Sequence, residues 1–370
     1  MKKVLLILSA LTLIIASALA ETKKQDGYEL TLKPTRPDAI YKLDEQATFK
    51  LQVTKDGKPA AGLNIKGQFT KDSVAPRTPI EGNTDEKGEF EISGKIDEPG
   101  FLKCQLFVDL PASKEGEKSN KIEMLAGAGF EPFKIKPSLP CPDDFDKFWN
   151  EQKQILKKIP MNIRLEPAES DDPNILVYDL QADTYNGKLS AYLIMPKDNK
   201  PKSHPAIVLP QGAGVYSSFK TYEWAKRGYI TLCFNVHGIP NGKDRKFYDE
   251  LQNTSLRGYE RSGAESRETI FFREAYMRVM RAMNAIMAQP QWDGKHLVIS
   301  GGSQGAGQAI AGAALYSDKV TLMAGNYPAL CDHSGIVVGR QRAGRTLSRK
   351  RTRTATTTRP QSKLRATSTA

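Results

Sequence analysis

Residues 297–307 have the sequence Leu-Val-Ile-Ser-Gly-Gly-Ser-Gln-Gly-Ala-Gly, which contains the pattern Gly-x-Ser-x-Gly around Ser303. The apolar residues before this pattern predict a buried strand, and the small residues after it predict a helix. A tight turn from strand to helix projects the serine hydroxyl beyond the edge of a sheet, and the glycines let neighbouring backbone approach without a Cβ clash. Ser303 would also lie at a helix N-terminus, which stabilises developing negative charge. The stretch therefore predicts a nucleophilic serine in an α/β fold; a glycine turn without chemistry is the alternative.

Two backbone amides are candidates for the oxyanion hole that a serine nucleophile requires. The first is the N–H of Gln304, because it is adjacent to the nucleophile. The second is expected in the loop 210–214, which follows an apolar strand ending at Leu209, and Ala213 is the candidate there. A glycine-rich turn that binds no ligand is the alternative. Neither Gly212-x-Gly214 nor Gly305-x-Gly307 continues to the third glycine of a dinucleotide-binding loop. Serine chemistry itself needs no metal or organic cofactor. We therefore expect no cofactor.

Strands and helices alternate around this stretch. The hydrophobic pattern predicts strands at 175–181, 189–195, 205–209, 229–235, 296–300 and 320–325. It predicts helices at 143–158, 218–227, 269–288 and 303–316. The runs at 206–209 and 297–299 are apolar on both faces, which is typical of parallel strands covered by helices. The repeated order of strand, helix and strand predicts a mostly parallel α/β sheet with right-handed crossovers and helices on both faces.

The region before this sheet has the pattern of short β-strands. Apolar residues alternate along 47–53, and similar runs occur at 63–69, 89–92 and 101–108. Turn residues cluster between these runs, and no helical periodicity interrupts them. We predict a small all-β, immunoglobulin-like sandwich over 21–130. It contains no evident catalytic residue, so a binding or spacer role is expected.

A serine nucleophile needs a histidine base that an acid holds in place. His204 and His296 precede their strands and should lie at the opposite edge of the sheet from Ser303. His237 and His333 follow strands and should lie at the same edge. However, His237 precedes Ser303, whereas the histidine follows the serine along the chain in this architecture. The acid next to His333 is Asp332, and a residue adjacent in the chain cannot easily orient the imidazole ring. The sequence therefore identifies no base.

Positive charge is concentrated at the two ends of the chain. The 370 residues have a formal net charge of +12, but residues 21–338 hold 42 basic and 42 acidic residues. A neutral body argues against nucleic-acid binding. Residues 1–20 combine two lysines, an apolar run and Ala18-Leu19-Ala20, the pattern of a secretory signal peptide cleaved near Ala20; an uncleaved anchor is the alternative. No other run reaches the ~18 apolar residues of a membrane span. We expect an exported protein, periplasmic or extracellular.

The four cysteines are widely spaced and include no Cys-x-x-Cys pair. This spacing gives no support for a zinc site. Cys233 and Cys331 lie in or beside apolar runs, so we expect both to be buried free thiols.

Four segments together resemble the acetyl xylan esterase / cephalosporin-C deacetylase family of α/β hydrolases. They are Pro-Asp-Asp-Phe-Asp-Lys-Phe-Trp at 142–149, Gln-Pro-Gln-Trp-Asp-Gly-Lys at 289–295, Gly-Gly-Ser-Gln-Gly at 301–305 and Pro-Ala-Leu-Cys-Asp at 328–332. The resemblance extends from about 138 to 340. It implies that acetylated oligosaccharides or other small acetyl esters are deacetylated through an acetyl-Ser303 intermediate. It also implies oxyanion donors at Gln304 and Ala213, the residues chosen above, and assembly into a homo-oligomer.

The sequence after Arg340 departs from the family. The catalytic Asp and His of the family lie well downstream of the serine, whereas 67 residues follow Ser303 here, and 341–370 contain no acidic or aromatic residue. We expect a disordered basic tail that arises from a shift of the reading frame near Arg340, and hence an esterase that is inactive as written. A native tail that binds acidic polymers is the alternative. The expected organisation is a signal peptide at 1–20, the β-sandwich at 21–130, an incomplete α/β hydrolase domain at 138–340 and the tail at 341–370.

Two other functions stay open on the sequence. One is a non-catalytic exported carbohydrate-binding protein in which the β-sandwich carries the function. The other is a general carboxylesterase or peptidase, because the nucleophile turn is shared by several hydrolase activities.

Overall fold

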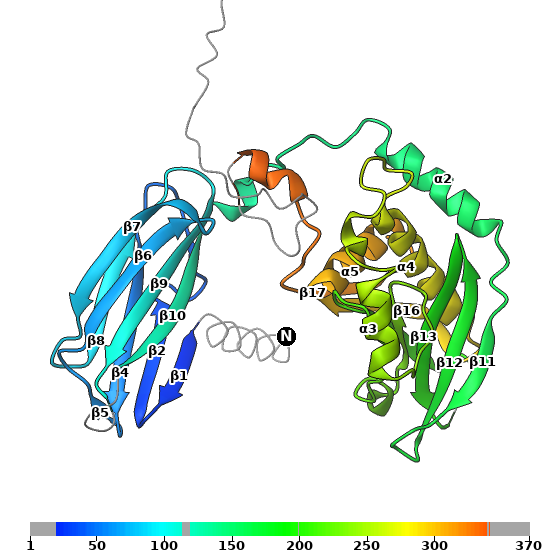
Figure 1. The fold of residues 1–370 in the computed structure, drawn as a ribbon, viewed down its shortest axis with the longest axis horizontal. Helices are drawn as coiled ribbons and strands as arrows, with labels where there is room; N and C mark the ends of the chain where they lie inside the picture. The colour runs from blue at the N-terminus through cyan, green and yellow to red at the C-terminus, as the bar shows by residue number, and fades with distance from the viewer. Residues whose placement is uncertain (1–19, 113–118, 199, 339, 341–370) are drawn as a thin grey trace, which may run out of the picture. The chain divides into compact units, whose positions relative to one another are not determined.

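The computed structural model describes residues 20–112, 119–198, 200–338 and 340. The expected signal peptide, apart from Ala20, and the expected tail at 341–370 therefore lie outside the described residues. The described residues form two compact units (Figure 1): the first comprises those up to Asp143 together with 332–338 and Arg340, and the second spans Asp144–Cys331. None of the helices in the described ranges has the length and apolar composition of a membrane span.

The first unit is a sandwich of two five-stranded sheets, as predicted. The strands of one sheet are β1 (Glu21–Gln25), β2 (Tyr28–Pro34), β4 (Ala47–Lys55), β5 (Lys58–Pro59) and β8 (Glu89–Gly94). Those of the other are β3 (Ile40–Tyr41), β10 (Asn120–Phe130), β9 (Gly100–Leu110), β6 (Asn64–Lys71) and β7 (Val74–Asn83). Every second side chain of β4 is buried, from Ala47 to Val53, because successive residues of a strand face opposite sides of the sheet. A short 3-10 turn, η1 (Pro132–Lys134), follows β10.

The second unit is built on a seven-stranded sheet. Its strands, in spatial order, are β11 (Arg164–Ala168), β12 (Ile175–Thr184), β13 (Gly187–Pro196), β15 (Ile230–Asn235), β14 (His204–Pro210), β16 (Trp292–Gly302) and β17 (Leu322–Asn326). The pairs β14–β15, β14–β16 and β16–β17 are parallel. The pairs from β11 to β15 are antiparallel, so the sheet is mixed, and its parallel half carries Ser303. The α/β class expected from the sequence is confirmed.

Four α-helices accompany the sheet: α2 (Phe145–Lys157), α3 (Arg245–Asn253), α4 (Phe271–Met287) and α5 (Gln304–Leu315). Short 3-10 turns in this unit are η2 (Ala225–Arg227) and η3 (Tyr259–Arg261), whereas η4 (His333–Val338) belongs to the first unit. Helix α4 is buried almost throughout, and its Met280 and Ile286 join one apolar core with Leu232 and Ile299 of the strands. This core holds the parallel strands and α5 rigidly around the Ser303 turn.

Three buried arginines of α4 have partners that offset the cost of burying their charge. The guanidinium of Arg273 donates to Gln152 Oε1 of α2 at 2.7 and 2.9 Å. Arg278 donates to the carbonyls of Lys188 and Val236. Arg281 donates to the carbonyls of Leu156 and Ile159, at the end of α2. A buried ionised group needs such hydrogen bonds, so these contacts fix α4 against its neighbours.

Two expectations about local structure are wrong, and one helix has no counterpart among the predicted elements. The segment 218–227 is not a helix: it is irregular except for η2, and the Ser218 amide donates to the side chain of Asn241 instead of a helical carbonyl. Cys331 is exposed rather than buried, whereas Cys233 is buried and free as expected. Helix α3, which begins where the side chain of Asp244 caps the amide of Phe247, was not expected from the sequence.

Candidate active site

The turn at Ser303 has the strained backbone that a projecting serine requires. Ser303 has φ 54° and ψ −121°, a region that L-residues rarely occupy. The turn is held because the Ser303 amide donates to the carbonyl of Asn326 at 3.0 Å. A Cβ on Gly301 would lie 2.5 Å from the carbonyl carbon of Gly305, and a Cβ on Gly305 would lie 2.4 Å from the carbonyl oxygen of Pro210, so both flanking glycines are needed where the strand turns into the helix. The residue Ser303 is half-buried at the start of α5.

The two candidate oxyanion donors lie on elements that meet beside Ser303. Gln304 is the first residue of α5, where no preceding carbonyl is available to its amide within the helix. Ala213 is exposed in the loop after β14. For neither amide do the described residues supply a hydrogen-bond acceptor. Helix and loop are connected because the side chain of Gln308 donates to the carbonyl of Gln211 at 2.9 Å.

A buried pair of rings, His237 and Tyr259, lies behind this loop. His237 Nε2 is 3.0 Å from the carbonyl oxygen of Gly214, and the two rings meet edge to face with centroids 4.5 Å apart. A carbonyl oxygen only accepts, so Nε2 carries the proton. His237 Nδ1 is buried and has no partner among the described residues. Burial and the charge of Arg278 lower the pKa of His237 to about 4, so the ring is neutral near pH 7.

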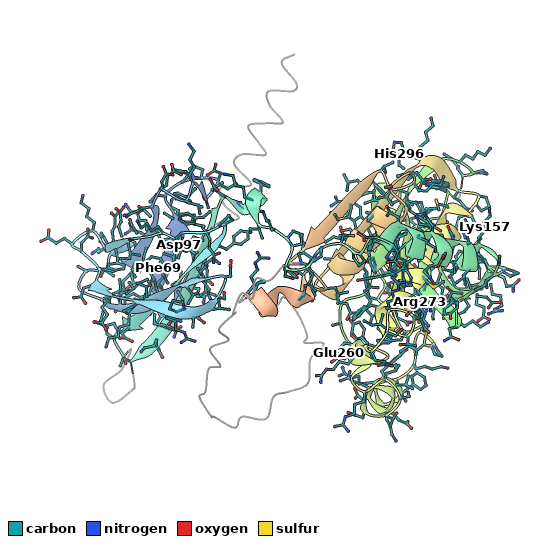
Figure 2. The ribbon with its side chains drawn as sticks, turned by 90° about the horizontal axis from the view of Figure 1, so that it is seen from above. Phe69, Asp97, Lys157, Glu260, Arg273 and His296 are labelled. Atoms are coloured by element: carbon teal, nitrogen blue, oxygen red, sulfur yellow. The ribbon has the colours of Figure 1, made fainter. Side chains whose placement is uncertain are left out.

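Two of the other histidines, His204 and His296, are bonded to groups other than Ser303. His204, at the start of β14, is 2.8 Å from the carbonyl of Gly228 and 3.1 Å from a carboxylate oxygen of Asp198. His296 pairs with Asp293 at 2.7 Å, and Figure 2 shows it at the opposite end of this unit from Glu260. Both positions agree with the expectation that these histidines lie at the far edge. The side chain of His333 is outside the described part of the chain.

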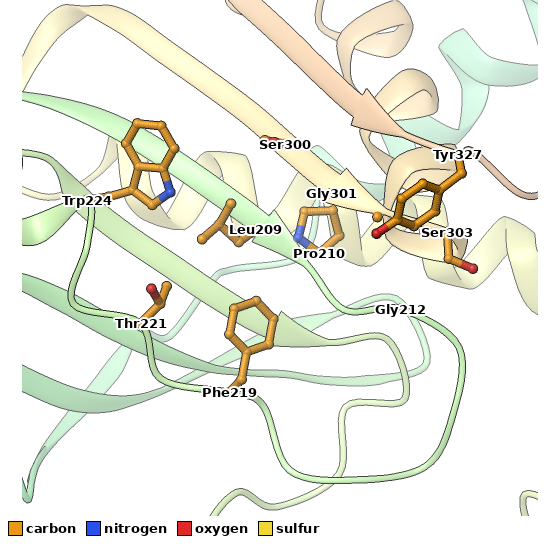
Figure 3. Close-up of a pocket in the computed structure, with 11 residues that line it drawn as sticks. Leu209, Pro210, Gly212, Phe219, Thr221, Trp224, Ser300, Gly301, Ser303 and Tyr327 are labelled. Carbon is orange, nitrogen blue, oxygen red and sulfur yellow. The ribbon is translucent and has the colours of Figure 1, made fainter. Parts of the chain in front are cut away.

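A cavity of about 470 Å³ opens beside Ser303. Figure 3 shows the side chains of Ser303 and Tyr327 at one end of it and that of Trp224 at the other, with Phe219 and Leu209 between them. The cavity combines apolar and aromatic side chains with a polar hydroxyl, which is typical of pockets for small organic ligands.

One neighbour of the site was not singled out from the sequence. Tyr259 is 45 residues from both Gly214 and Gln304 along the chain, yet its hydroxyl bonds to both. No local motif marks it, so only the fold identifies it.

Comparison with known proteins gives a consistent result. A model of the acetyl xylan esterase family (AXE1) matches residues 132–344. The acetyl esterase Axe7A of Xylanibacter ruminicola is 28% identical over 355 residues, which cover 92% of this chain and 76% of that protein.

Two solved structures are also similar. The acetyl xylan esterase from Paenibacillus sp. R4 is 24% identical, with a TM-score of 0.46 over 55% of this chain and 65% of its own. Acetyl xylan esterase 1 from Thermoanaerobacterium sp. JW/SL YS485 is 22% identical, with a TM-score of 0.43 over 54% of this chain and 62% of its own. The match thus spans less than two thirds of either solved chain.

Proposed function

The chain belongs to the acetyl xylan esterase family of carboxylic ester hydrolases, and from this we propose that it deacetylates acetylated sugars or similar small acetyl esters with Ser303 as nucleophile. The observation that carries the proposal is the backbone of Ser303, held at φ 54° where α5 begins and beside a cavity. Strain of this kind persists only where the surrounding structure enforces it, and it is concentrated at functional sites.

The proposed reaction proceeds in two steps. Ser303 Oγ attacks the acetyl carbonyl carbon, the carbonyl oxygen becomes negatively charged, and the amides of Gln304 and Ala213 donate to that oxygen. The bond to the sugar oxygen then breaks, and the sugar leaves as an alcohol that has taken up the proton lost by Ser303. Water then attacks the carbonyl carbon of acetyl-Ser303; one of its protons returns to Ser303 Oγ, and acetate and the other proton are released. Amides arranged in advance stabilise both tetrahedral intermediates, because the start of α5 favours negative charge.

We further propose that this chain hydrolyses acetyl esters slowly. Among the described residues, no histidine side chain is hydrogen-bonded to Ser303, and His237 is committed to Gly214. A serine hydrolase without its base keeps only the part of its catalysis that binding and the oxyanion hole supply, roughly 10³–10⁴ over water.

Chemical rescue tests this proposal. Hydrolysis of p-nitrophenyl acetate is measured for the full chain and for Ser303→Ala at increasing concentrations of imidazole. Since imidazole hydrolyses the ester by itself, the Ser303→Ala series gives the background. The proposal predicts a slow rate that depends on Ser303 and rises with imidazole above this background. Equal rates for the two proteins at every concentration would contradict it.

We also propose export with cleavage after Ala20, and assembly into a homo-oligomer. The basis for export is the pattern of residues 1–20, and the basis for assembly is the family resemblance. Expression in a Gram-negative host tests export: the purified protein should begin at Glu21 and be found in the periplasm or the medium. An intact Met1 on protein recovered from the cytoplasm would contradict it. The mass in solution, measured by light scattering, tests assembly, and a monomer would contradict it.

A further inference from the structure

The hydroxyl of Tyr259 connects the two elements that carry the proposed oxyanion donors. It accepts from the amide of Gly214 at 3.2 Å and donates to Oε1 of Gln304 at 2.9 Å. Gly214 follows Ala213 directly, so the first bond holds the peptide unit next to the Ala213 amide. Gln304 supplies the other proposed amide, and its buried side chain receives the second bond. One buried hydroxyl therefore uses both its donor and its acceptor capacity across the oxyanion hole.

The surroundings of Tyr259 leave this hydroxyl little freedom. The side chain is 5% exposed and packs edge to face on His237 and on Phe271. His237 in turn holds the carbonyl of Gly214, so both peptide units that flank the α-carbon of Gly214 are fixed. Gly214 has φ 132°, and a Cβ on it would lie 2.6 Å from the ring of Tyr216, so only glycine fits here. These contacts thus hold the loop in one conformation.

We propose that Tyr259 is a positioning residue that fixes the separation and direction of the amides of Ala213 and Gln304 through Gly214 and the Gln304 side chain. The inference rests on the proposed function, since it concerns the same oxyanion hole. Donors aligned before the reaction stabilise the tetrahedral intermediate without reorganisation, and this alignment matters more for the intermediate than for the substrate. Tyr259 itself touches no reacting atom.

The test compares Tyr259→Phe with Tyr248→Phe in the full chain. Tyr248 is a suitable control because it lies in the same unit and is only 3% exposed. Its hydroxyl accepts from the backbone amide of Lys243 and donates to the carbonyl of Pro240. Each substitution removes one buried hydroxyl that accepts from a backbone amide and donates to a carbonyl oxygen, and keeps the ring. Only Tyr259 contacts the proposed oxyanion hole, so a general loss of packing affects both variants, whereas a positioning role affects one.

Three quantities are measured for each protein: the rate of Ser303 acetylation by p-nitrophenyl acetate, the KM for this ester, and the inhibition constant of phenylboronic acid, which forms a tetrahedral adduct with a reactive serine. Losing one oxyanion donor outright costs about 10²–10³ in rate, so a misaligned donor should cost about tenfold. We expect Tyr259→Phe to lower the acetylation rate about tenfold, weaken the boronate by a similar factor and leave KM within twofold. Tyr248→Phe should change none of the three.

A double variant tests the connection to Gln304. The substitution Gln304→Met keeps the backbone amide and removes the acceptor of the Tyr259 hydroxyl. Because Tyr259 and Gln304 act through one hydrogen bond, the double variant Tyr259→Phe/Gln304→Met should be no slower than the slower single variant. Fully multiplicative losses would contradict the connection.

The outcomes separate this inference from the function on which it rests. If Tyr259→Phe keeps the parent rate and boronate affinity, or if Tyr248→Phe loses as much, the positioning role is overturned while the serine nucleophile stands. If Ser303→Ala is acetylated at the same peptide, or binds the boronate as the parent does, the proposed function itself fails.

Discussion

A Cβ atom on Gly305 would lie 2.4 Å from the carbonyl oxygen of Pro210, closer than real Cβ atoms approach an oxygen. The helix that begins after Ser303 and the loop that carries Ala213 therefore touch backbone to backbone. This contact fixes the distance between the nucleophile and the loop, and it explains in physical terms the second glycine of the Gly-x-Ser-x-Gly pattern.

Substituting this glycine should separate the loop from the nucleophile. In Gly305→Ala, either the helix or Pro210 must move, because the clash is with backbone and not with a flexible side chain. We expect the unfolding free energy to fall by about 1–3 kcal/mol, as is typical of overpacking, and acetylation of Ser303 to slow by at least about tenfold, since misplacement of an oxyanion donor weakens the transition state. Urea unfolding and the p-nitrophenyl acetate assay measure the two effects.

Gly127→Ala is the matched control for this prediction. Its Cβ would meet only the carbonyl of Leu102, at 3.7 Å, which is ordinary van der Waals contact. It should keep the acetylation rate of the parent. A Gly305→Ala protein that behaves like Gly127→Ala would show that the loop and the helix are not in close contact.

The buried His237 should make stability depend on pH. Its pKa is lowered to about 4 in the folded protein by burial and by the charge of Arg278, against about 6.5 in the unfolded chain. Between these values the unfolded chain binds a proton that the folded protein does not, so the unfolding free energy falls as the pH falls from about 6.5 to about 4. The loss from this residue is on the order of 3 kcal/mol.

His237→Gln isolates the contribution of this histidine. Glutamine retains an N–H that can donate to Gly214 but has no proton to gain in this range. The difference in urea-unfolding free energy between the parent and this variant should therefore shrink steadily between pH 6.5 and pH 4. If the unfolding free energies of the two proteins change with pH in parallel, His237 binds its proton as readily in the folded protein as in the unfolded chain. That result would contradict the burial of the ring.

The four thiols should react at different rates with a disulfide reagent. Burial raises the pKa of Cys104 to about 12 and raises that of Cys233 as well, whereas Cys141 and Cys331 are exposed. The thiolate is the reactive form, so Cys141 and Cys331 should react in the native protein, and Cys104 and Cys233 only after unfolding. Titration with 5,5′-dithiobis(2-nitrobenzoic acid), followed by peptide mapping, measures this order. Early modification of Cys233 would show that the sheet is open.

The sequence predicts the parts of the fold whose signals are local. The apolar run before Ser303 and the small residues after it correctly indicate β16 and α5, and alternation along 47–53 correctly indicates β4. In each case the burial pattern of one element decides its structure, and that pattern is present in a few consecutive residues.

The failures occur where the local signal is weak or where the contact joins distant parts of the chain. Half of the residues in the segment 218–227 have weak helix propensity, and the amide of Ser218 is satisfied by the distant side chain of Asn241. Helix α3 is only nine residues long, mostly polar, and buries only Tyr248, so few apolar residues mark it in the sequence. The bridge from Gly214 through Tyr259 to Gln304 has no sequence signal, because it is made by residues 45 positions apart that only the folded chain brings together. Local patterns therefore indicate the nucleophile turn but not the groups that support it.

The most direct test of the central claim, that Ser303 is the nucleophile, is to determine which residue carries the acetyl group after reaction with an ester. The full chain is incubated with p-nitrophenyl acetate, quenched in acid, digested and examined by mass spectrometry, with Ser303→Ala and the urea-unfolded parent as controls. Because no described histidine contacts Ser303 to activate the deacylating water, the acetyl group should accumulate on Ser303 in the folded parent and in neither control. Acetylation spread over surface lysines, with Ser303 unmodified, would contradict the account.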